Sequence, residues 1–213
     1  MTDHRFRVAV LVSGEGSNLQ AIIDSVHGRD GVEVVGVASS RAEARALERA
    51  RAAGIETTVV AAADHDGRAA RDRALASWLE ELRVDLIVLA GFMELLSAEL
   101  VRRFEQRIVN VHPALLPAFP GLRAIEQAIE HGVKVTGVTV HYVDEGVDSG
   151  PIILQRAIEF TYPARVEEVE RRMHEVEHEL LPEAIGLIAR GAVRHDPAQP
   201  RRILIEERAG AGG

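Results

Sequence analysis

The sequence predicts an α/β protein built on a doubly wound, mostly parallel sheet with an antiparallel extension toward the C-terminus. Two observations predict this fold class. Short apolar runs alternate with segments of helical period through the first 112 residues, and this order gives parallel strands with helices on both faces. After residue 133 the apolar residues alternate with period two instead, which is typical of antiparallel strands.

Five apolar runs are predicted strands, and several of them are apolar on both faces, as buried parallel strands are. They cover residues 6–13, 32–39, 56–62, 84–91 and 107–111. The segments between them carry apolar residues at spacings of three and four and predict helices; these are 17–28, 41–54, 67–83 and 97–107. This fourfold alternation places a ligand crevice beyond the carboxyl ends of the strands.

The second half of the chain begins with a further predicted helix over residues 122–132. The period-two run 134–143, the turn-rich segment 144–150 and the apolar run 151–160 indicate a hairpin that is partly exposed on one face. A long helix is expected over 166–190, followed by a polar stretch. No linker or internal repeat divides the sequence, so we expect one domain over residues 1–205 and a disordered tail over 206–213.

Composition excludes several classes of function. The 213 residues are 46% hydrophobic and 27% charged, with a net charge of −8, which argues against a nucleic-acid partner. The absence of cysteine rules out disulfides, thiolate nucleophiles and cysteine-bound metals. No apolar run approaches the ~20 residues that span a bilayer, and the first one ends in glycines, unlike a secretory signal. We therefore expect a cytoplasmic protein without a membrane partner. The oligomeric state stays open, a homodimer included.

A glycine-rich loop, VSGEGSNLQ, joins the first strand to the first helix. Gly14 and Gly16 fit the dinucleotide-binding pattern, but Leu19 occupies the place of its third glycine. A single phosphate bound by the main-chain N–H groups of Gly16, Ser17 and Asn18 is one interpretation, since a helix N-terminus favours anions. A tight turn in which Ser17 caps the helix is the other.

The run IVNVHPALLPAFPG places a carboxamide and an imidazole where a strand meets a stiff loop. Asn110 and His112 lie two residues apart, so their side chains point to the same face of the strand. An amide can donate to an oxyanion, and an imidazole can move a proton. Pro113 cannot donate to the sheet and ends the strand. A strand-end cap with a satisfied histidine is the alternative.

Asp148 follows the period-two strand, in the segment HYVDEGVDSGPI, and the predicted topology brings it to the same end of the sheet. A carboxylate beside His112 would favour the protonated imidazole. His141, Asp144 and Asp148 could instead form a metal site with His112. That alternative has less support, because these residues have no standard ligand spacing.

Four segments resemble the formyltransferases that use 10-formyltetrahydrofolate. They are LVSGEGSNLQAII, LAGFMELLS, NVHPALLPAFPG and GVTVHYVDEGVDSGPIILQ, and they occur in that family's order over about residues 7–185. The resemblance implies a Rossmann-like formyltransferase fold. The element SGEGSN narrows it to members that formylate glycinamide ribonucleotide (5′-phosphoribosylglycinamide, GAR) for purine biosynthesis, with 10-formyltetrahydrofolate as the formyl donor and no metal.

The resemblance also implies roles for particular residues. Asn110, His112 and Asp148 would be catalytic. The residues that contact GAR would be Gly16, Ser17, Asn18 and Glu177, and those that contact folate would be Arg68, Met93, Glu94, Leu95, Leu96 and Asn110. Family members often carry Arg or Lys where this chain has Glu94, and some carry His where it has Arg123. The departure at Arg123 leaves the role of that residue open.

Three alternatives share features of the resemblance. Formyltetrahydrofolate hydrolase normally has an additional N-terminal domain, for which a first strand at Phe6 leaves no room. Methionyl-tRNA formyltransferase normally adds a C-terminal RNA-binding domain and a basic surface, and we expect neither in this sequence. A non-catalytic folate or nucleotide-binding module on the same sheet is the third, and the presence of Asn110, His112 and Asp148 speaks against it.

Overall fold

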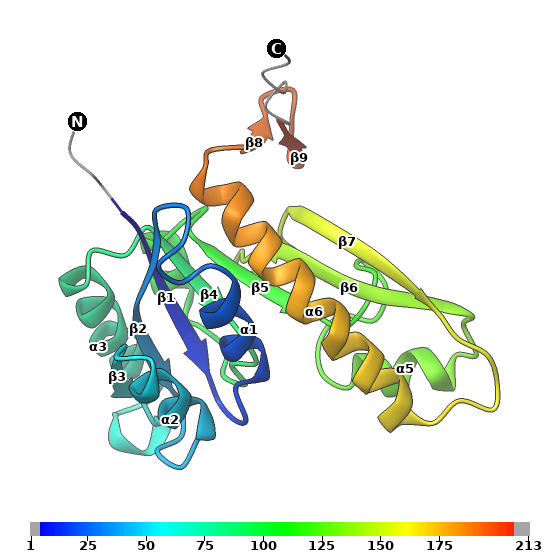
Figure 1. The fold of residues 1–213 in the computed structure, drawn as a ribbon, viewed down its shortest axis with the longest axis horizontal. Coiled ribbons are helices and arrows are strands. Elements are labelled where there is room, and N and C mark those ends of the chain that lie inside the picture. The colour runs from blue at the N-terminus through cyan, green and yellow to red at the C-terminus, as the bar shows by residue number, and fades with distance from the viewer. Residues whose placement is uncertain (1–4, 207–213) are drawn as a thin grey trace.

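The structure, a computed structural model, describes residues 5–206 and confirms the predicted fold class. A seven-stranded sheet has the order β3-β2-β1-β4-β5-β6-β7 (Figure 1). Its strands are β1 Phe6–Val12, β2 Val32–Ser39, β3 Glu56–Val59, β4 Leu86–Leu89, β5 Ile108–His112, β6 Val135–Tyr142 and β7 Ile152–Glu159. Strands β1 to β5 are parallel to one another, and β6 and β7 are antiparallel to their neighbours.

Helices cover both faces of the sheet (Figure 1). They are α1 Ser17–Ser25, α2 Arg45–Ala52, α3 Arg68–Glu81, α4 Ala98–Arg103, α5 Ala124–Glu130 and α6 Val166–Ala189, with a 3-10 turn at Ala62–Asp64. Val8 and Val10 of β1 belong to the apolar core that includes α1, α2 and α6. Ala9 and Leu11 belong to a second core, with α3 and α4. Burial on both sides explains why β1 is a continuous apolar run.

The antiparallel extension differs from its predicted exposure. Strand β6 is buried on both faces from Thr136 to Tyr142, because the proline-rich loop after β5 packs against it. The Thr139 hydroxyl donates to the Ala114 carbonyl at 2.6 Å and accepts the Leu116 N–H at 3.1 Å. Only β7, at the sheet edge, is half exposed.

A second, two-stranded sheet at the C-terminal end is absent from the sequence-based prediction. It pairs β8 Val193–Asp196 with β9 Gln199–Ile205. Most of its residues are exposed, so they lack the apolar alternation that indicates a strand. Apart from Glu206, the predicted disordered tail lies outside the described residues. No described helix is long and apolar enough to cross a membrane.

Candidate active site

A cavity of about 410 Å³ lies at the carboxyl end of β5. Its lining includes Asn110, His112, Asp148, Arg68, Met93 and Leu95. The structure therefore brings together the predicted catalytic residues and the predicted folate wall. A larger cavity of about 660 Å³, between the start of β6 and the N-terminal end of α6, contains none of the predicted site residues.

Strand β5 presents Asn110 and His112 on one face, as their spacing predicts. In the antiparallel pairing, Asn110 lies opposite His141 of β6, and His112 lies opposite Thr139. His112 and His141 are 5% and 2% exposed. The strand ends at His112, directly before Pro113, which holds the imidazole at the rim of the sheet.

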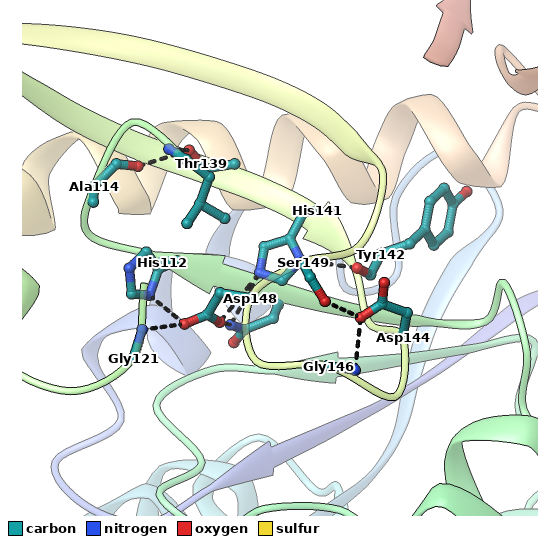
Figure 2. Close-up of polar contacts among 12 residues, drawn as sticks. His112, Ala114, Gly121, Thr139, His141, Tyr142, Asp144, Gly146, Asp148 and Ser149 are labelled. Atoms are coloured by element: carbon teal, nitrogen blue, oxygen red, sulfur yellow. Dashed lines mark hydrogen bonds and ion pairs between the residues drawn. The ribbon is translucent and has the colours of Figure 1, made fainter. Parts of the chain in front are cut away.

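Asp148 lies between the two imidazoles (Figure 2). One carboxylate oxygen, Oδ2, accepts the Gly121 N–H at 2.8 Å and lies 3.3 Å from His112 Nδ1. The other, Oδ1, accepts from the Asn110 amide nitrogen at 3.2 Å and lies 3.5 Å from His141 Nε2. One carboxylate therefore joins β5, β6 and the loop after Pro113.

The far nitrogen of each imidazole is bonded to a backbone carbonyl. His112 Nε2 is 2.9 Å from the Phe119 carbonyl, and His141 Nδ1 is 2.8 Å from the Tyr142 carbonyl. Because a carbonyl can only accept, each of these nitrogens carries a proton. A proton on the nitrogen that faces Asp148 then makes the ring an imidazolium, and the carboxylate stabilises that charge.

The pKa of the Asp148 carboxyl is lowered from its ordinary value. Burial acts in the opposite direction, but it is outweighed by the hydrogen bond with His141, the Gly121 N–H and the charges of both imidazoles. The carboxyl is therefore ionised throughout the neutral range. Its side chain is 14% exposed, so solvent only partly screens its charge.

The loop 144–150 holds Asp148 in an uncommon backbone conformation, with φ of 48°. Asp144 organises the loop from within, because its Oδ1 accepts the Gly146 N–H at 3.0 Å and the Ser149 hydroxyl at 2.6 Å (Figure 2). A Cβ on Gly150 would lie 1.8 Å from the Tyr142 carbonyl oxygen. Only glycine lets the loop return this close to β6.

The alternative metal site is not formed in the described part of the chain. Asp144 turns into its own loop, away from the two imidazoles. Within residues 5–206, no group of three or more histidine, aspartate or glutamate side chains is placed to hold a metal ion.

His141 is the residue of this site that the sequence-based interpretation missed as a possible functional group. The sequence pointed to it only as a ligand of the alternative metal site. Its amide neighbour is Asn110, whose nitrogen is 3.3 Å from His141 Nε2. The period-two run of β6 is the sequence feature that could have pointed to His141. The register that sets His141 opposite Asn110, however, depends on strand pairing, which the sequence does not specify.

The glycine loop forms a second cluster, between α1 and α6. Gly16, with φ of 76°, is the N-cap of α1, and Ser17 is its first helical residue. The alternative in which Ser17 caps the helix is therefore wrong. Counting from the start of α1, Gln20 is the first residue whose main-chain N–H has an acceptor, the Gly16 carbonyl at 2.9 Å. Those of Ser17 and Asn18 have none within residues 5–206, which leaves them available to an anion.

The side chains of this cluster converge on Glu177, which is 4% exposed. Asn18 donates its amide N–H to Glu177 Oε2 at 2.9 Å, and His174 Nδ1 lies 2.9 Å from the same oxygen. The hydrogen bond to Glu177 raises the pKa of His174, against the opposing effect of burial. The buried Asn18 Oδ1 has no hydrogen-bond partner among the described residues.

The predicted folate wall is an apolar surface at the mouth of the 410 Å³ cavity. Met93 and Leu95 are 63% and 58% exposed, and Leu122 and Val147, which line the same cavity, are 78% and 55% exposed. Exposed apolar side chains gathered around a cavity are typical of a ligand site. Arg123 also lines the cavity, where it pairs with Glu126 at 3.4 Å.

Comparisons with known proteins relate this chain to one family. The family model described as formyl transferase matches residues 6–185. The phosphoribosylglycinamide formyltransferase of Bacillus subtilis is 40% identical over 190 residues, which cover 87% of this chain and 97% of that protein. The trifunctional purine biosynthetic protein adenosine-3 of Drosophila pseudoobscura pseudoobscura is 46% identical over 91% of this chain.

This chain spans only 14% of the length of that Drosophila relative. Among solved structures, glycinamide ribonucleotide transformylase 1 of Symbiobacterium toebii has a TM-score of 0.91 and 48% identity. The match covers 96% of this chain and 95% of that one. At this identity the likeness extends beyond the fold to the sequence itself.

Proposed function

The chain belongs to the formyl transferase family, and from this premise we propose that it transfers the formyl group of 10-formyltetrahydrofolate to the amine of GAR. The products are formyl-GAR and tetrahydrofolate, in purine biosynthesis. The relatives from Bacillus subtilis and Symbiobacterium toebii carry the name of this activity. The observation that carries the proposal is the contact of one carboxylate, Asp148, with both Asn110 and His112 in the cavity.

The proposed reaction is a direct transfer. The neutral amine of GAR attacks the formyl carbon and forms a C–N bond, and the carbonyl electrons move onto the formyl oxygen. The bond from that carbon to N10 of the folate then breaks, and the proton lost by the amine ends on N10. No covalent bond forms between the enzyme and the formyl group, so the chain supplies orientation, charge stabilisation and proton transfer.

Asn110 donates to the formyl oxygen as negative charge develops on it. Its amide nitrogen faces Asp148 Oδ1 and His141 Nε2, an orientation that keeps the amide oxygen away from the carboxylate. These two partners orient the amide before substrates bind, and one of the two contacts is given up when Asn110 donates to the formyl oxygen. A preorganised donor of this kind contributes about 3 kcal/mol to catalysis.

His112 stabilises the same oxyanion or delivers the proton to N10, and Asp148 supports it in either role. The carboxylate fixes the ring through Nδ1 while the Phe119 carbonyl fixes Nε2. Both ring nitrogens are occupied in the free protein, so in either role the ring exchanges one of these contacts, that of Nε2 with the Phe119 carbonyl or that of Nδ1 with Asp148, for one with the substrate.

The two substrates occupy the two clusters. The apolar wall at Met93 and Leu95 takes the flat rings of the folate, with Arg68 at the same cavity. The N–H groups of Ser17 and Asn18 take the phosphate of GAR at the N-terminus of α1. Glu177, an acceptor, suits the hydroxyl groups of the ribose, and the unpaired Asn18 Oδ1 offers a second acceptor.

Formyl transfer is tested by following the formyl carbon. The protein is incubated with GAR and with 10-formyltetrahydrofolate that carries ¹³C in the formyl group, and the products are identified by mass spectrometry. The proposal predicts labelled formyl-GAR in an amount equal to the tetrahydrofolate released. Label recovered only as free formate would support the hydrolase, and binding of both substrates without turnover would support a binding module.

A further inference from the structure

We propose that Arg71 and Asp72, a buried ion pair in the first turns of α3, position the segment Met93–Ser97 and thereby set the affinity for the formyl donor. The inference rests on the proposed function, because it takes this segment as the folate wall. Neither residue lines the cavity, so both act through the wall and are positioning residues.

The segment needs to be held because it has no regular secondary structure of its own. It runs between the end of β4 at Leu89 and the start of α4 at Ala98. Met93 and Leu95 expose more than half of their side chains, so core packing does not fix them. The backbone polar groups of such a segment require partners elsewhere in the fold.

Arg71 and Asp72 supply partners at three points. Arg71 Nη2 donates to the Leu95 carbonyl at 2.8 Å, and Nη1 donates to the Glu94 carboxylate at 2.9 Å. Asp72 Oδ2 accepts the N–H of Ser97. A fourth contact from another element, the N–H of Met93 to the Ser13 hydroxyl at 2.9 Å, holds the opposite end.

The two side chains also hold one another. Arg71 Nε donates to Asp72 Oδ1 at 2.8 Å, and Nη2 lies 2.7 Å from the same oxygen. Each residue is 1% exposed, and Arg71 is the largest fully buried side chain among the described residues. All three guanidinium nitrogens are thus engaged, and two of them fix the wall.

Stability alone is a poor explanation for this arrangement. A buried ion pair is often no more stabilising than apolar residues of the same volume. The planar guanidinium of Arg71, in contrast, binds the Asp72 carboxylate, the Leu95 carbonyl and the Glu94 carboxylate in fixed directions. The pair therefore fits a role in geometry, and the geometry it fixes is that of the cavity wall.

The conservative variant Arg71→Lys tests this role. Lysine keeps the charge beside Asp72 but has one nitrogen, so it cannot also hold Leu95 and Glu94. Initial rates are measured with each substrate varied in turn, and hydrogen exchange of a peptide that covers residues 91–97 is followed by mass spectrometry. Arg73→Lys, two residues along the same helix and exposed, is the matched control.

We expect Arg71→Lys to raise KM for 10-formyltetrahydrofolate at least fivefold, with KM for GAR within twofold and faster exchange at 91–97. The control should match the parent in all three. Equal changes in both KM values, or a lower melting temperature with both KM values unchanged, would overturn the proposal. A parent protein that does not transfer formyl groups at all would instead overturn the proposed function.

A second variant decides the matter if Arg71→Lys does not fold. Asp72→Asn keeps the shape of the side chain but removes the charge that Ser97 and Arg71 contact, and we expect it to raise KM for the formyl donor at least threefold, with KM for GAR within twofold. If Asp72→Asn also fails to fold, the pair is a folding element and the proposal is wrong.

Discussion

Asp148→Asn is the substitution that most sharply tests how the site works. It removes the charge between the two imidazoles and leaves the size of the side chain unchanged. The backbone tolerates it, because φ at this position is 48° and asparagine is among the few residues that adopt positive φ readily. Asn can still accept the Gly121 N–H that Asp148 Oδ2 accepts now. The loop is therefore expected to keep its conformation.

The expected loss follows from one distance. In a transition state in which His112 carries a proton on both nitrogens, a carboxylate oxygen 3.3 Å from the ring attracts that charge by about 5 kcal/mol at an effective dielectric constant of about 20. Asparagine replaces part of this attraction with a neutral hydrogen bond. Solvent at the mouth of the cavity also weakens the attraction in the parent. A net loss of about 3 kcal/mol in transition-state stabilisation corresponds to a fall in kcat of about 10²-fold.

The assay is the steady-state rate of formyl transfer at pH 7 to 8, together with the melting temperature. Glu145→Gln is the control, because it removes a charge from the same loop and the same cavity lining, at a side chain that pairs with Arg102 at 2.9 Å instead of with an imidazole. We expect its kcat to match the parent. An Asp148→Asn enzyme that melts normally and turns over within threefold of the parent would refute the electrostatic role of Asp148.

Three further substitutions test other parts of the account. Asn110→Ala should lower kcat at least a hundredfold, about 3 kcal/mol, at an unchanged melting temperature, and turnover within threefold of the parent would contradict oxyanion stabilisation. Glu177→Gln should raise KM for GAR at least fivefold and leave KM for the formyl donor within twofold, whereas equal effects would make the α1–α6 cluster merely structural. His174→Gln tests pH dependence. The pKa of His174 is raised above its ordinary value of 6.5, chiefly by its hydrogen bond to Glu177. The protonated ring therefore stabilises the folded state fully below pH 6.5, and this stabilisation is lost as the pH rises through the folded pKa. The variant should therefore unfold at lower denaturant concentration than the parent at pH 6 and at the same concentration at pH 9; a difference that does not depend on pH would exclude this origin.

The structure also shows that Gly16→Val is a poor test of phosphate binding by the glycine loop. Gly16→Val would block the approach of a phosphate, but it would equally disturb the free protein. A Cβ at Gly16 lies 2.6 Å from that of Ala46, and φ is 76°. Glu177→Gln is the cleaner test of GAR binding, because that side chain can lose its charge without a change in volume.

Much of the arrangement of the candidate site could be predicted, because its residues follow local rules. Asn110 and His112 share a face through the two-residue period of a strand, and Pro113 marks where that strand ends. Asp148 required only the order of elements, which brings its loop to the same end of the sheet. These inferences need no knowledge of exact register or packing.

Other features depend on tertiary contacts that leave no local pattern. Arg71 belongs to a helix that is otherwise rich in exposed charges, and its burial arises from the wall segment 23 to 24 residues away. His141 gains its place from the β5–β6 register. The hairpin of β8 and β9 is mostly exposed, and it is fixed by contacts such as that of Arg201 with the Ser149 carbonyl at 2.8 Å.

In the proposed function, Asn110, His112 and Asp148 activate the formyl group for attack by the amine of GAR and not by water. The most direct test is the initial rate of tetrahydrofolate release from 10-formyltetrahydrofolate, measured with and without saturating GAR. We expect a rate that depends on GAR, with release in its absence lower by at least a hundredfold. Release at the same rate without GAR would contradict it and identify water as the acceptor.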